Sequence, residues 1–286
     1  MFRPPAERDS VLIRVADGCP HNSCAFCAMY RGVRYRVHDH DTILSRIGQA
    51  AARNPDARRI FLTDGDVLAL PAPLLATILA TARAAFPRLS RVNCYASGRA
   101  LAEKTDSELK SLRGAGLRTL YLGLESGCEE VLRRMAKGGS LGETIAGCVR
   151  AGRAGLSVSV MVLIGIGGQE LSASHASLTA DALNAMQPAM LSCLRLVPIP
   201  GTALAARIAD GRFVQLTEEQ SVRELRDILS GLDLARTVFR ADHSSNILPL
   251  AGRLPRDKAL LLAELDELLE CGALDADSPG PMPALL

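Results

Sequence analysis

Aromatic residues are scarce in this chain of 286 residues: they make up 3% of it, and tryptophan is absent. Proteins that bind single-stranded nucleic acid or carbohydrate commonly stack the ligand on aromatic side chains, so the composition argues against both classes. An excess of charge of one sign is also missing, because 33 lysines and arginines face 31 aspartates and glutamates. The bulk charge therefore requires no nucleic-acid partner, and a neutral or weakly anionic small molecule fits equally well.

Long hydrophobic runs are also missing. No apolar stretch approaches the roughly 20 residues of a transmembrane helix, and the first ten residues lack the apolar core of a signal peptide. We therefore expect a cytoplasmic protein with no membrane partner. Disulfides are rare in that reducing compartment, so the eight cysteines are expected to be metal ligands where they cluster and small buried residues where they do not.

What the chain does have is a regular alternation of β-rich runs and amphipathic helical segments, which predicts an α/β fold with a parallel sheet. Several of the runs are nearly continuous Val, Ile and Leu, as in strands covered on both faces. The predicted strands span residues 11–18, 59–65, 91–97, 119–126, 157–165 and 191–199. The predicted helices span residues 41–52, 71–85, 105–115, 129–154, 170–186, 217–231 and 255–270. No strand is predicted after Gly201.

Three cysteines, Cys19, Cys24 and Cys27, cluster directly after the first predicted strand. In β/α barrels the loops that follow the strands form the active face. Structural zinc sites and electron-transfer clusters normally take four protein ligands, whereas three thiolates leave one iron of a [4Fe–4S] cluster open. The amino and carboxylate groups of S-adenosylmethionine are suited to that iron, so the loop indicates both cofactors.

Two other interpretations of the cysteine loop stay open. His21 could complete a zinc site, and the three thiols could be ordinary loop residues. Phe26, directly before the third cysteine, is either a core residue or an aromatic that flanks the adenine of the cofactor.

The predicted strand ends carry a matching series of motifs. They are Thr63-Asp64-Gly65-Asp66, Tyr95-Ala96-Ser97, Leu124-Glu125-Ser126-Gly127, Gly165-Ile166-Gly167-Gly168-Gln169 and Val197-Pro198-Ile199-Pro200-Gly201-Thr202. With the cysteine loop, this order over residues 11–202 resembles the radical S-adenosylmethionine (radical SAM) superfamily, in the branch of oxygen-independent coproporphyrinogen oxidases, tRNA methylthiotransferases and elongator-type proteins. The chain departs from that branch by four residues, instead of three, between the first two cysteines, which gives a variant Cx4CxxC motif.

The resemblance implies a partial (β/α)6 barrel of the TIM type over residues 1–204 and a helical extension over residues 205–286 that covers the barrel mouth. It also implies cofactor-binding residues: Phe26, Asp64, Gly65, Asp66, Tyr95, Ser97, Glu125, Lys137 and Pro198. Each of them also has a plainer interpretation as a turn, surface or core residue. Read alone, the glycine turn at residues 165–169 is a weak motif that resembles a phosphate cradle but lacks its lysine.

Substrate identity is expected in the part after Thr202. The segment from residue 239 to 246 is rich in hydrogen-bonding groups, so His243, Ser244 and Asn246 are candidate substrate contacts, and the alternative is a capped surface loop. Arg31, Arg34 and Arg36 either meet an anionic substrate or solvate the loop after the cysteines. The remaining cysteines show no paired spacing, so no auxiliary cluster is expected, and Cys94 is expected to be a packed strand residue.

The sequence and the resemblance thus favour a radical SAM enzyme that cleaves S-adenosylmethionine reductively and abstracts hydrogen from an unidentified substrate. The resemblance implies an electron donor such as flavodoxin or ferredoxin. The alternative is a non-catalytic iron–sulfur or heme-binding carrier on the same barrel. A zinc-stabilised binding module is a third class.

Overall fold

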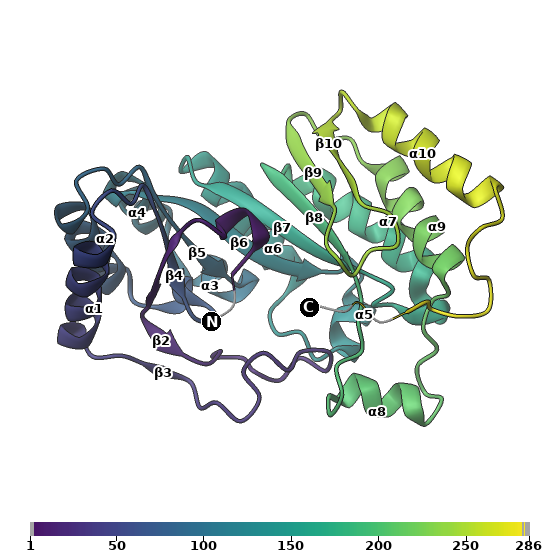
Figure 1. Cartoon of the computed structure of the whole chain (residues 1–286), viewed down its shortest axis with the longest axis horizontal. Coiled ribbons are helices and arrows are strands. Elements are labelled where there is room, and N and C mark those ends of the chain that lie inside the picture. Colours follow the sequence, from purple (N-terminus) through teal and green to yellow (C-terminus); the bar gives the residue numbers. More distant parts are fainter. Residues whose placement is uncertain (1–2, 282, 284–286) are drawn as a thin grey trace. The chain divides into compact units, whose positions relative to one another are not determined.

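The computed structural model describes residues 3–281 and 283, and it is an α/β fold with a mostly parallel eight-stranded sheet (Figure 1). The predicted fold class is therefore confirmed. The strands of that sheet are β1 (Val11–Arg14), β4 (Arg59–Thr63), β5 (Arg91–Ala96), β6 (Leu117–Glu125), β7 (Ser157–Ile164), β8 (Met190–Arg195), β9 (Thr237–Ala241) and β10 (Leu250–Leu254). A separate pair is formed by β2 (Ala16–Asp17) and β3 (Arg36–Val37).

The helices follow the strands in the β-α order that the sequence predicts. They are α1 (His40–Arg53), α2 (Ala72–Ala85), α3 (Gly98–Glu103), α4 (Asp106–Ala115), α5 (Glu129–Arg134), α6 (Leu141–Arg153), α7 (Gly168–Met186), α8 (Ala203–Ala209), α9 (Glu218–Gly231) and α10 (Lys258–Glu270). Short 3-10 turns lie at Pro5–Glu7 and Val67–Ala69. Of the helices that the structure describes, none combines the length and the apolar character that crossing a membrane requires.

The first compact unit comprises residues 1–22, 29–123 and 142–158. Its strands pair in parallel in the order β1-β4-β5-β6, with Ile13 opposite Leu62 and Leu62 opposite Cys94. The centre of this sheet is fully buried, since Ile60, Phe61, Leu62 and Cys94 have no exposed surface. Strands covered on both faces explain the continuous apolar runs in the sequence, and the predicted packing role of Cys94 is confirmed.

Local capping signals set the helix ends in this unit. Thr105 and Glu108 form a capping box at the start of α4, in which the Thr105 hydroxyl accepts from the Glu108 N–H at 3.2 Å. Gly116 ends the helix in the left-handed conformation, at a φ of 117°, which costs glycine little. The predicted helix over residues 105–115 is therefore confirmed.

The longer helical region expected over residues 129–154 is divided into two helices in the structure. The structure has α5 and α6 there, and the segment between them contains Gly138 and Gly139, the latter at a φ of 95°. α5 ends at Arg134, and the residues that follow leave the helical conformation, with Ala136 at a φ of 49° and Gly139 in the left-handed conformation that glycine tolerates. Apolar periodicity on both sides hides the break in the sequence.

The second compact unit comprises residues 23–28, 124–141 and 159–286. Here β7, β8 and β9 pair in parallel and β10 pairs antiparallel with β9, while α9 packs on both α7 and α10 (Figure 1). The expectation that no strand follows Gly201 is wrong, since β9 and β10 both lie there. Each has five residues, and Arg240 and Arg253 interrupt their apolar pattern, which makes such short strands hard to recognise.

Candidate cofactor site

The loop that carries the cysteines is closed at its base by β2 and β3. Ala16 pairs with Val37 and Asp17 with Arg36, so residues 18–35 form a loop between two joined ends. The Asp17 carboxylate faces His38 Nε2 at 3.2 Å and Arg36 at 3.4 Å. Burial alone would raise the pKa of Asp17, but the neighbouring His38, Arg36 and Arg14 together hold it below its usual value, so Asp17 stays ionised at the base of the loop.

In the first unit, the turn after β4 packs directly on the start of the cysteine loop. A Cβ atom at Gly65 would lie 2.4 Å from the Gly18 carbonyl oxygen and 2.6 Å from Cys19 Cα. Only glycine allows two backbones to approach so closely. Gly65 and Cys19, which the sequence singled out separately, are therefore in contact.

Tyr30 ties the same two segments together. Its hydroxyl group donates to Asp64 Oδ1 at 3.2 Å and accepts from the Gly65 N–H at 3.0 Å. Burial raises the pKa of Tyr30 well above its usual value, so the phenol keeps the proton that it donates. Tyr30 belongs to no motif in the sequence, although its place three residues after Cys27 is a usable signal.

The two acids of the turn have different partners. Asp64, buried with 5% of its side chain exposed, faces Arg14 Nε at 3.2 Å, which offsets the cost of burying its charge. Asp66 accepts a hydrogen bond from the Ser97 N–H at 3.2 Å. The Ser97 hydroxyl caps α3 by accepting from the Ala100 N–H at 3.0 Å. Asp66 and Ser97, both predicted cofactor contacts, thus lie side by side.

Tyr95 belongs to an aromatic group in the first unit. Its ring meets Phe61 edge-on, with 5.0 Å between ring centroids, and Tyr121 at 6.5 Å. Burial, with Tyr30, Asp64 and Glu7 nearby, raises the pKa of Tyr95 above its usual value. The Tyr95 hydroxyl group is therefore a hydrogen-bond donor in the neutral state.

In the second unit, Glu125 and Lys137 form an ion pair, with 2.9 Å between Glu125 Oε1 and Lys137 Nζ. Only 11% of the Glu125 side chain and 21% of the Lys137 side chain are exposed. Glu125 ends β6 at a φ of 66°, a left-handed conformation that is strained for a residue with a side chain and occurs often at functional sites. The structure brings together two residues that were predicted separately.

The middle of the cysteine loop is anchored in the second unit. The Ala25 N–H donates to the Met135 carbonyl group at 2.8 Å, and the Leu204 N–H donates to the Ala25 carbonyl group at 2.9 Å. Phe26 packs on the buried cluster that contains Cys128 and Ile166. Pro198 is partly buried in the segment after β8.

Ser126, which directly follows Glu125, belongs to a buried array with His175 and Glu224. Ser126 Oγ is 2.8 Å from His175 Nδ1, and His175 Nε2 is 3.6 Å from Glu224 Oε1. The Gly165 N–H donates to Glu224 Oε1 at 2.5 Å, and the Ser172 hydroxyl donates to Glu224 Oε2. The array therefore joins the end of β6 to the turn after β7.

Burial shifts both titratable groups of this array toward their neutral forms. It lowers the pKa of His175 to about 4 and raises the pKa of Glu224 to about 7. Ser126, His175 and Glu224 resemble a serine hydrolase triad in residue type, but Ser126 has no exposed surface. A nucleophile must reach its substrate, so this geometry fits a positioning role.

The candidate substrate contacts lie after β9. His243 Nδ1 is 2.9 Å from Ser245 Oγ, and Ser244 is exposed. The Asn246 amide bridges β8 and β9, because it donates to the carbonyl groups of Cys193 at 2.8 Å and Ala241 at 2.7 Å. The predicted contact of these residues with substrate stays a prediction.

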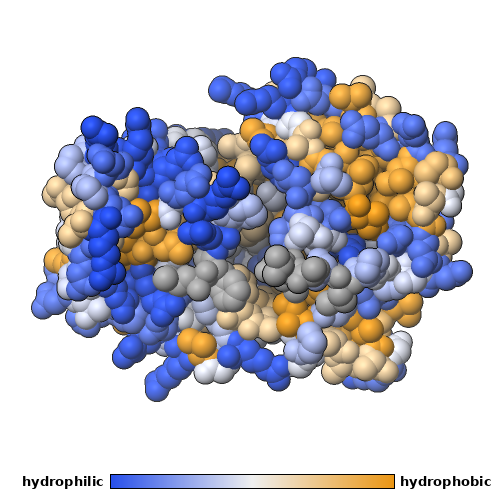
Figure 2. Space-filling model, in the orientation of Figure 1, coloured by the Kyte–Doolittle hydropathy of each residue, from blue (hydrophilic) through white to orange (hydrophobic). Residues whose placement is uncertain are grey.

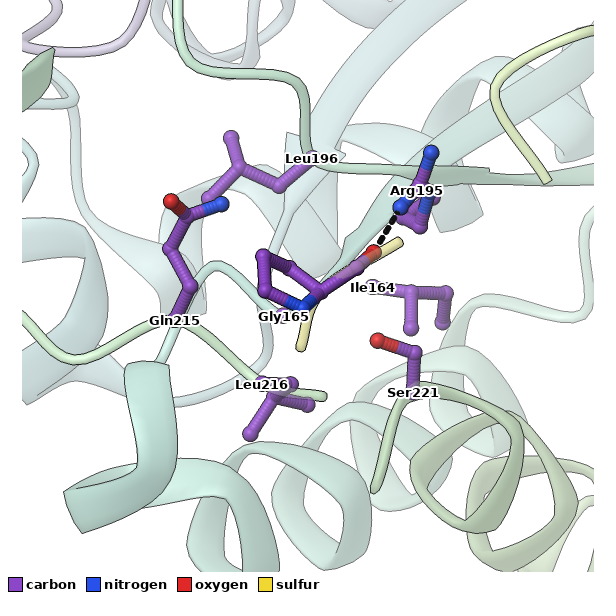
Figure 3. A pocket seen from close by; sticks show the side chains of 8 residues that line it. Ile164, Gly165, Arg195, Leu196, Gln215, Leu216 and Ser221 are labelled. Carbon is purple, nitrogen blue, oxygen red and sulfur yellow. Dashed lines mark hydrogen bonds between the residues drawn. The ribbon is translucent and has the colours of Figure 1, made fainter. Parts of the chain in front are cut away.

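A small pocket lies close to this segment, at the ends of β7 and β8, and Figure 3 shows the side chains that line it. Arg195 lies in its wall and donates to the carbonyl oxygens of Ser245 at 2.5 Å, Pro281 at 2.8 Å, and Pro279. The residues around the pocket are Ile164, Gly165, Arg195, Leu196, Gln215, Leu216, Ser221 and Pro279. The backbone of residues 279–281 is thereby attached to the end of β8.

The family model of the radical SAM superfamily matches residues 13–174, which is more than half of the chain. The chain belongs to the radical SAM superfamily. The matched region contains the cysteine loop, the Gly65 turn and the Glu125–Lys137 pair. A search of curated protein sequences gives no match.

Solved structures of other radical SAM proteins share the fold. The methyltransferase TsrM from Kitasatospora setae is 20% identical with a TM-score of 0.58, over 71% of this chain and 39% of TsrM. Coproporphyrinogen III oxidase HemN from Escherichia coli is 18% identical with a TM-score of 0.56, over 77% and 50%. Elp3 from Methanocaldococcus infernus is 14% identical with a TM-score of 0.55, over 94% and 65%. The chain spans about two fifths of TsrM and half of HemN.

The cysteines of this radical SAM chain suit an iron–sulfur cluster by their chemistry. All eight lie within the described residues, and none forms a disulfide. Cys19, Cys24 and Cys27 are each partly exposed, whereas Cys94, Cys128, Cys148 and Cys193 are buried. Across residues 3–281 and 283, no three His, Cys, Asp or Glu side chains are gathered as metal ligands. The fit therefore rests on three accessible thiols in one loop, the donor type that iron–sulfur clusters use.

Sequence patterns did not select four residues that contact the candidate residues or their neighbours: Arg14, Tyr30, His175 and Glu224. Each acts through a partner that is far away in the sequence, such as Asp64 for Tyr30 or Gly165 for Glu224. Only the position of Tyr30, just after the cysteines, offered a signal before the partners were known.

Proposed function

We propose that this radical SAM protein is an enzyme in which Cys19, Cys24 and Cys27 hold a [4Fe–4S] cluster that binds S-adenosylmethionine at its open iron. The observation that carries the proposal is the contact of Gly65 with Cys19, since it joins the ligand loop to the predicted binding turn for the cofactor. When bound, the cluster would supply the electron that cleaves S-adenosylmethionine to a 5′-deoxyadenosyl radical, which abstracts hydrogen from an unidentified substrate.

The residues around the Gly65 turn would bind part of the cofactor. The carboxylates of Asp64 and Asp66 accept hydrogen bonds, so they suit the amino group of the methionine part. Tyr30 and Arg14 already engage Asp64, which fixes the position of its carboxylate before a ligand arrives. Ser97 and Tyr95 supply hydroxyl groups close to this turn, with Ser97 held at the start of α3.

The ion pair of Glu125 and Lys137 would meet opposite charges on the cofactor. Glu125 can accept from a ribose hydroxyl or an amino group, and Lys137 can donate to a carboxylate. Their mutual contact at 2.9 Å keeps both charges compensated while no ligand is bound. The buried array of Ser126, His175 and Glu224 would hold the end of β6 in place, and Phe26 and Pro198 would bound the adenine.

The cluster proposal is tested by replacing Cys24 with alanine and, as a matched control, replacing the exposed Cys271 with alanine. After anaerobic reconstitution, we expect about four irons per chain in the wild type and in Cys271→Ala. In Cys24→Ala we expect at most a small fraction of that iron, because an iron loses its ligand.

The measurement is iron and acid-labile sulfide per chain, with 5′-deoxyadenosine as the second readout after reduction. Full iron and full product in Cys24→Ala would exclude the proposed ligand set. S-adenosylmethionine binding without any product in the reduced wild type would instead favour a non-catalytic carrier.

We further propose the branch of coproporphyrinogen oxidases, tRNA methylthiotransferases and elongator-type proteins, on the order of the strand-end motifs over residues 11–202. We also propose that the protein works in a reducing compartment, because the ligand thiols must stay reduced. An electron donor of the flavodoxin or ferredoxin type is proposed because the cluster must receive an electron.

A further inference from the structure

The loop after the cysteines carries positive charge without acidic residues. From residue 18 to residue 38 the sequence contains no aspartate or glutamate, whereas Arg31, Arg34 and Arg36 lie there. All three arginines are exposed. Arg36 faces Asp17 at 3.4 Å with 71% of its side chain exposed, and an ion pair that exposed stabilises little. We name residues 29–36 the basic loop.

The basic loop contains a tight turn, and two of its apolar side chains lie at the surface. The Tyr30 carbonyl group accepts from the Val33 N–H at 2.9 Å and from Asn22 Nδ2 at 2.9 Å, and Gly32 adopts a φ of 74° between them. The Tyr30 side chain is buried and anchors the turn. Met29 and Val33 remain 39% and 42% exposed, so the loop presents two apolar side chains beside its arginines.

Two such side chains within five positions are unusual for this protein. Among the described residues, five large hydrophobic side chains are exposed, and the other three are Leu178, Val214 and Leu260. Along the lower edge of Figure 2, where Figure 1 draws the loop between β2 and β3, hydrophilic side chains surround a small apolar spot. An apolar centre with a charged rim is typical of a protein-docking surface.

The basic loop also lies against the first cluster ligand. A Cβ atom at Gly18 would be 3.2 Å from the backbone of Tyr35, so the returning part of the loop packs beside Cys19. Burial, together with nearby Asp66 and Cys19, raises the pKa of Tyr35 above its usual value. An electron that enters through this surface reaches Cys19 by a short path, and the rate of electron transfer falls steeply with distance.

We propose that the basic loop docks an acidic one-electron carrier protein of the flavodoxin or ferredoxin class. This inference rests on the proposed function, because it requires a reducible cluster on Cys19, Cys24 and Cys27. The carrier gives up one electron and the cluster takes it up, so no bond forms or breaks. Arginines steer an acidic partner toward the loop, and Met29 and Val33 favour a protein over a nucleic acid as the occupant.

The test compares the reduction rate of the cluster with two reductants of opposite charge. We expect Arg34→Glu to lower the second-order rate constant with reduced flavodoxin about five- to tenfold, and Arg31→Glu/Arg34→Glu to lower it further. With reduced methyl viologen, a small cation, the rate should stay unchanged or rise. Raising the salt concentration should slow the wild type with flavodoxin more than it slows the variants.

The matched control is Arg153→Glu, which makes the same charge change at an exposed residue at the end of α6. Stopped-flow absorbance of the cluster gives the rates, after iron content and thermal unfolding have shown that each variant is loaded and folded.

Equal flavodoxin rates in the wild type and Arg34→Glu would overturn the docking surface while leaving the cluster proposal intact. Such equal rates, with loss of oligonucleotide binding in Arg34→Glu, would reassign the loop to nucleic acid. A wild type that takes up no reducible cluster would overturn the proposed function itself.

Discussion

Replacement of Gly65 by alanine is expected to remove most of the iron that the reconstituted chain retains. The added Cβ would lie 2.4 Å from the Gly18 carbonyl oxygen and 2.8 Å from Cys19 Cβ, distances that these atoms do not tolerate. Two of the atoms it meets belong to the backbone, so the loop itself must move. Overpacking of this kind costs about 1–3 kcal/mol, and the displacement falls on the first cluster ligand. We expect at least a tenfold loss of retained iron.

The matched control is Gly114→Ala, which adds the same methyl group inside α4. A Cβ there meets nothing within 4 Å, and alanine is favoured over glycine in a helix by about 1 kcal/mol. This control should keep its iron and unfold at an equal or slightly higher temperature. Iron per chain after gel filtration is the measurement. Equal iron retention in Gly65→Ala and Gly114→Ala would show that the contact with Cys19 does not position the loop.

The second large effect concerns the buried His175 and Glu224, whose single replacements should give opposite slopes of stability against pH. In His175→Gln, Glu224 remains with a folded pKa of about 7 against 4.5 for the free group. The contribution of Glu224 to the stability of the folded state is fully present below pH 4.5 and is lost as the pH rises through 7. In Glu224→Gln, His175 remains with a folded pKa of about 4 against 6.5, so stability is lost as the pH falls from 6.5 toward 4.

In each single variant the free energy of unfolding should change by about 3 kcal/mol over the pH range between the folded and unfolded pKa values, because one pKa unit corresponds to about 1.4 kcal/mol. In the wild type the folded pair holds one proton between about pH 4 and 7, and the unfolded groups hold one over nearly the same range. In the wild type the two pH dependences of stability should therefore nearly cancel. The double variant, which lacks both groups, should also show little pH dependence from this site. Urea unfolding at pH 4.5, 5.5 and 6.5 measures the slopes. Slopes of the same sign in the two single variants would contradict the burial of both groups in their neutral forms.

Most of the framework could be predicted from the sequence because its signals are local. Alternation of apolar runs and capping residues located six strands and most helices, as with Thr105 and Gly116 around α4. The strand pair β9–β10 could not be found this way, because each strand is short and carries an arginine. The break between α5 and α6 was hidden for a related reason, since periodicity continues across Gly138 and Gly139. The division at residue 204 stays a prediction.

The same holds for the candidate site residues: those in local motifs could be predicted from the sequence, and those that depend on contacts between distant segments could not. The cysteine spacing and Glu125 are visible in the sequence as motifs at strand ends. The contact of Gly65 with Cys19 and the bond from Tyr30 to Asp64 depend on packing between segments far apart in the chain. His175 in α7 has no sequence signal of its own, because a lone buried histidine becomes informative only when Ser126 and Glu224 are found beside it.

The central claim is that three cysteines leave one iron of the cluster open for S-adenosylmethionine. Electron paramagnetic resonance of the reduced, reconstituted chain tests it most directly, because the signal of a cluster changes when a ligand binds one of its irons. We expect the signal of the wild type to shift when S-adenosylmethionine is added, and 5′-deoxyadenosine to accumulate in the same sample. A cluster signal that stays unchanged with saturating S-adenosylmethionine, with no product formed, would contradict the account.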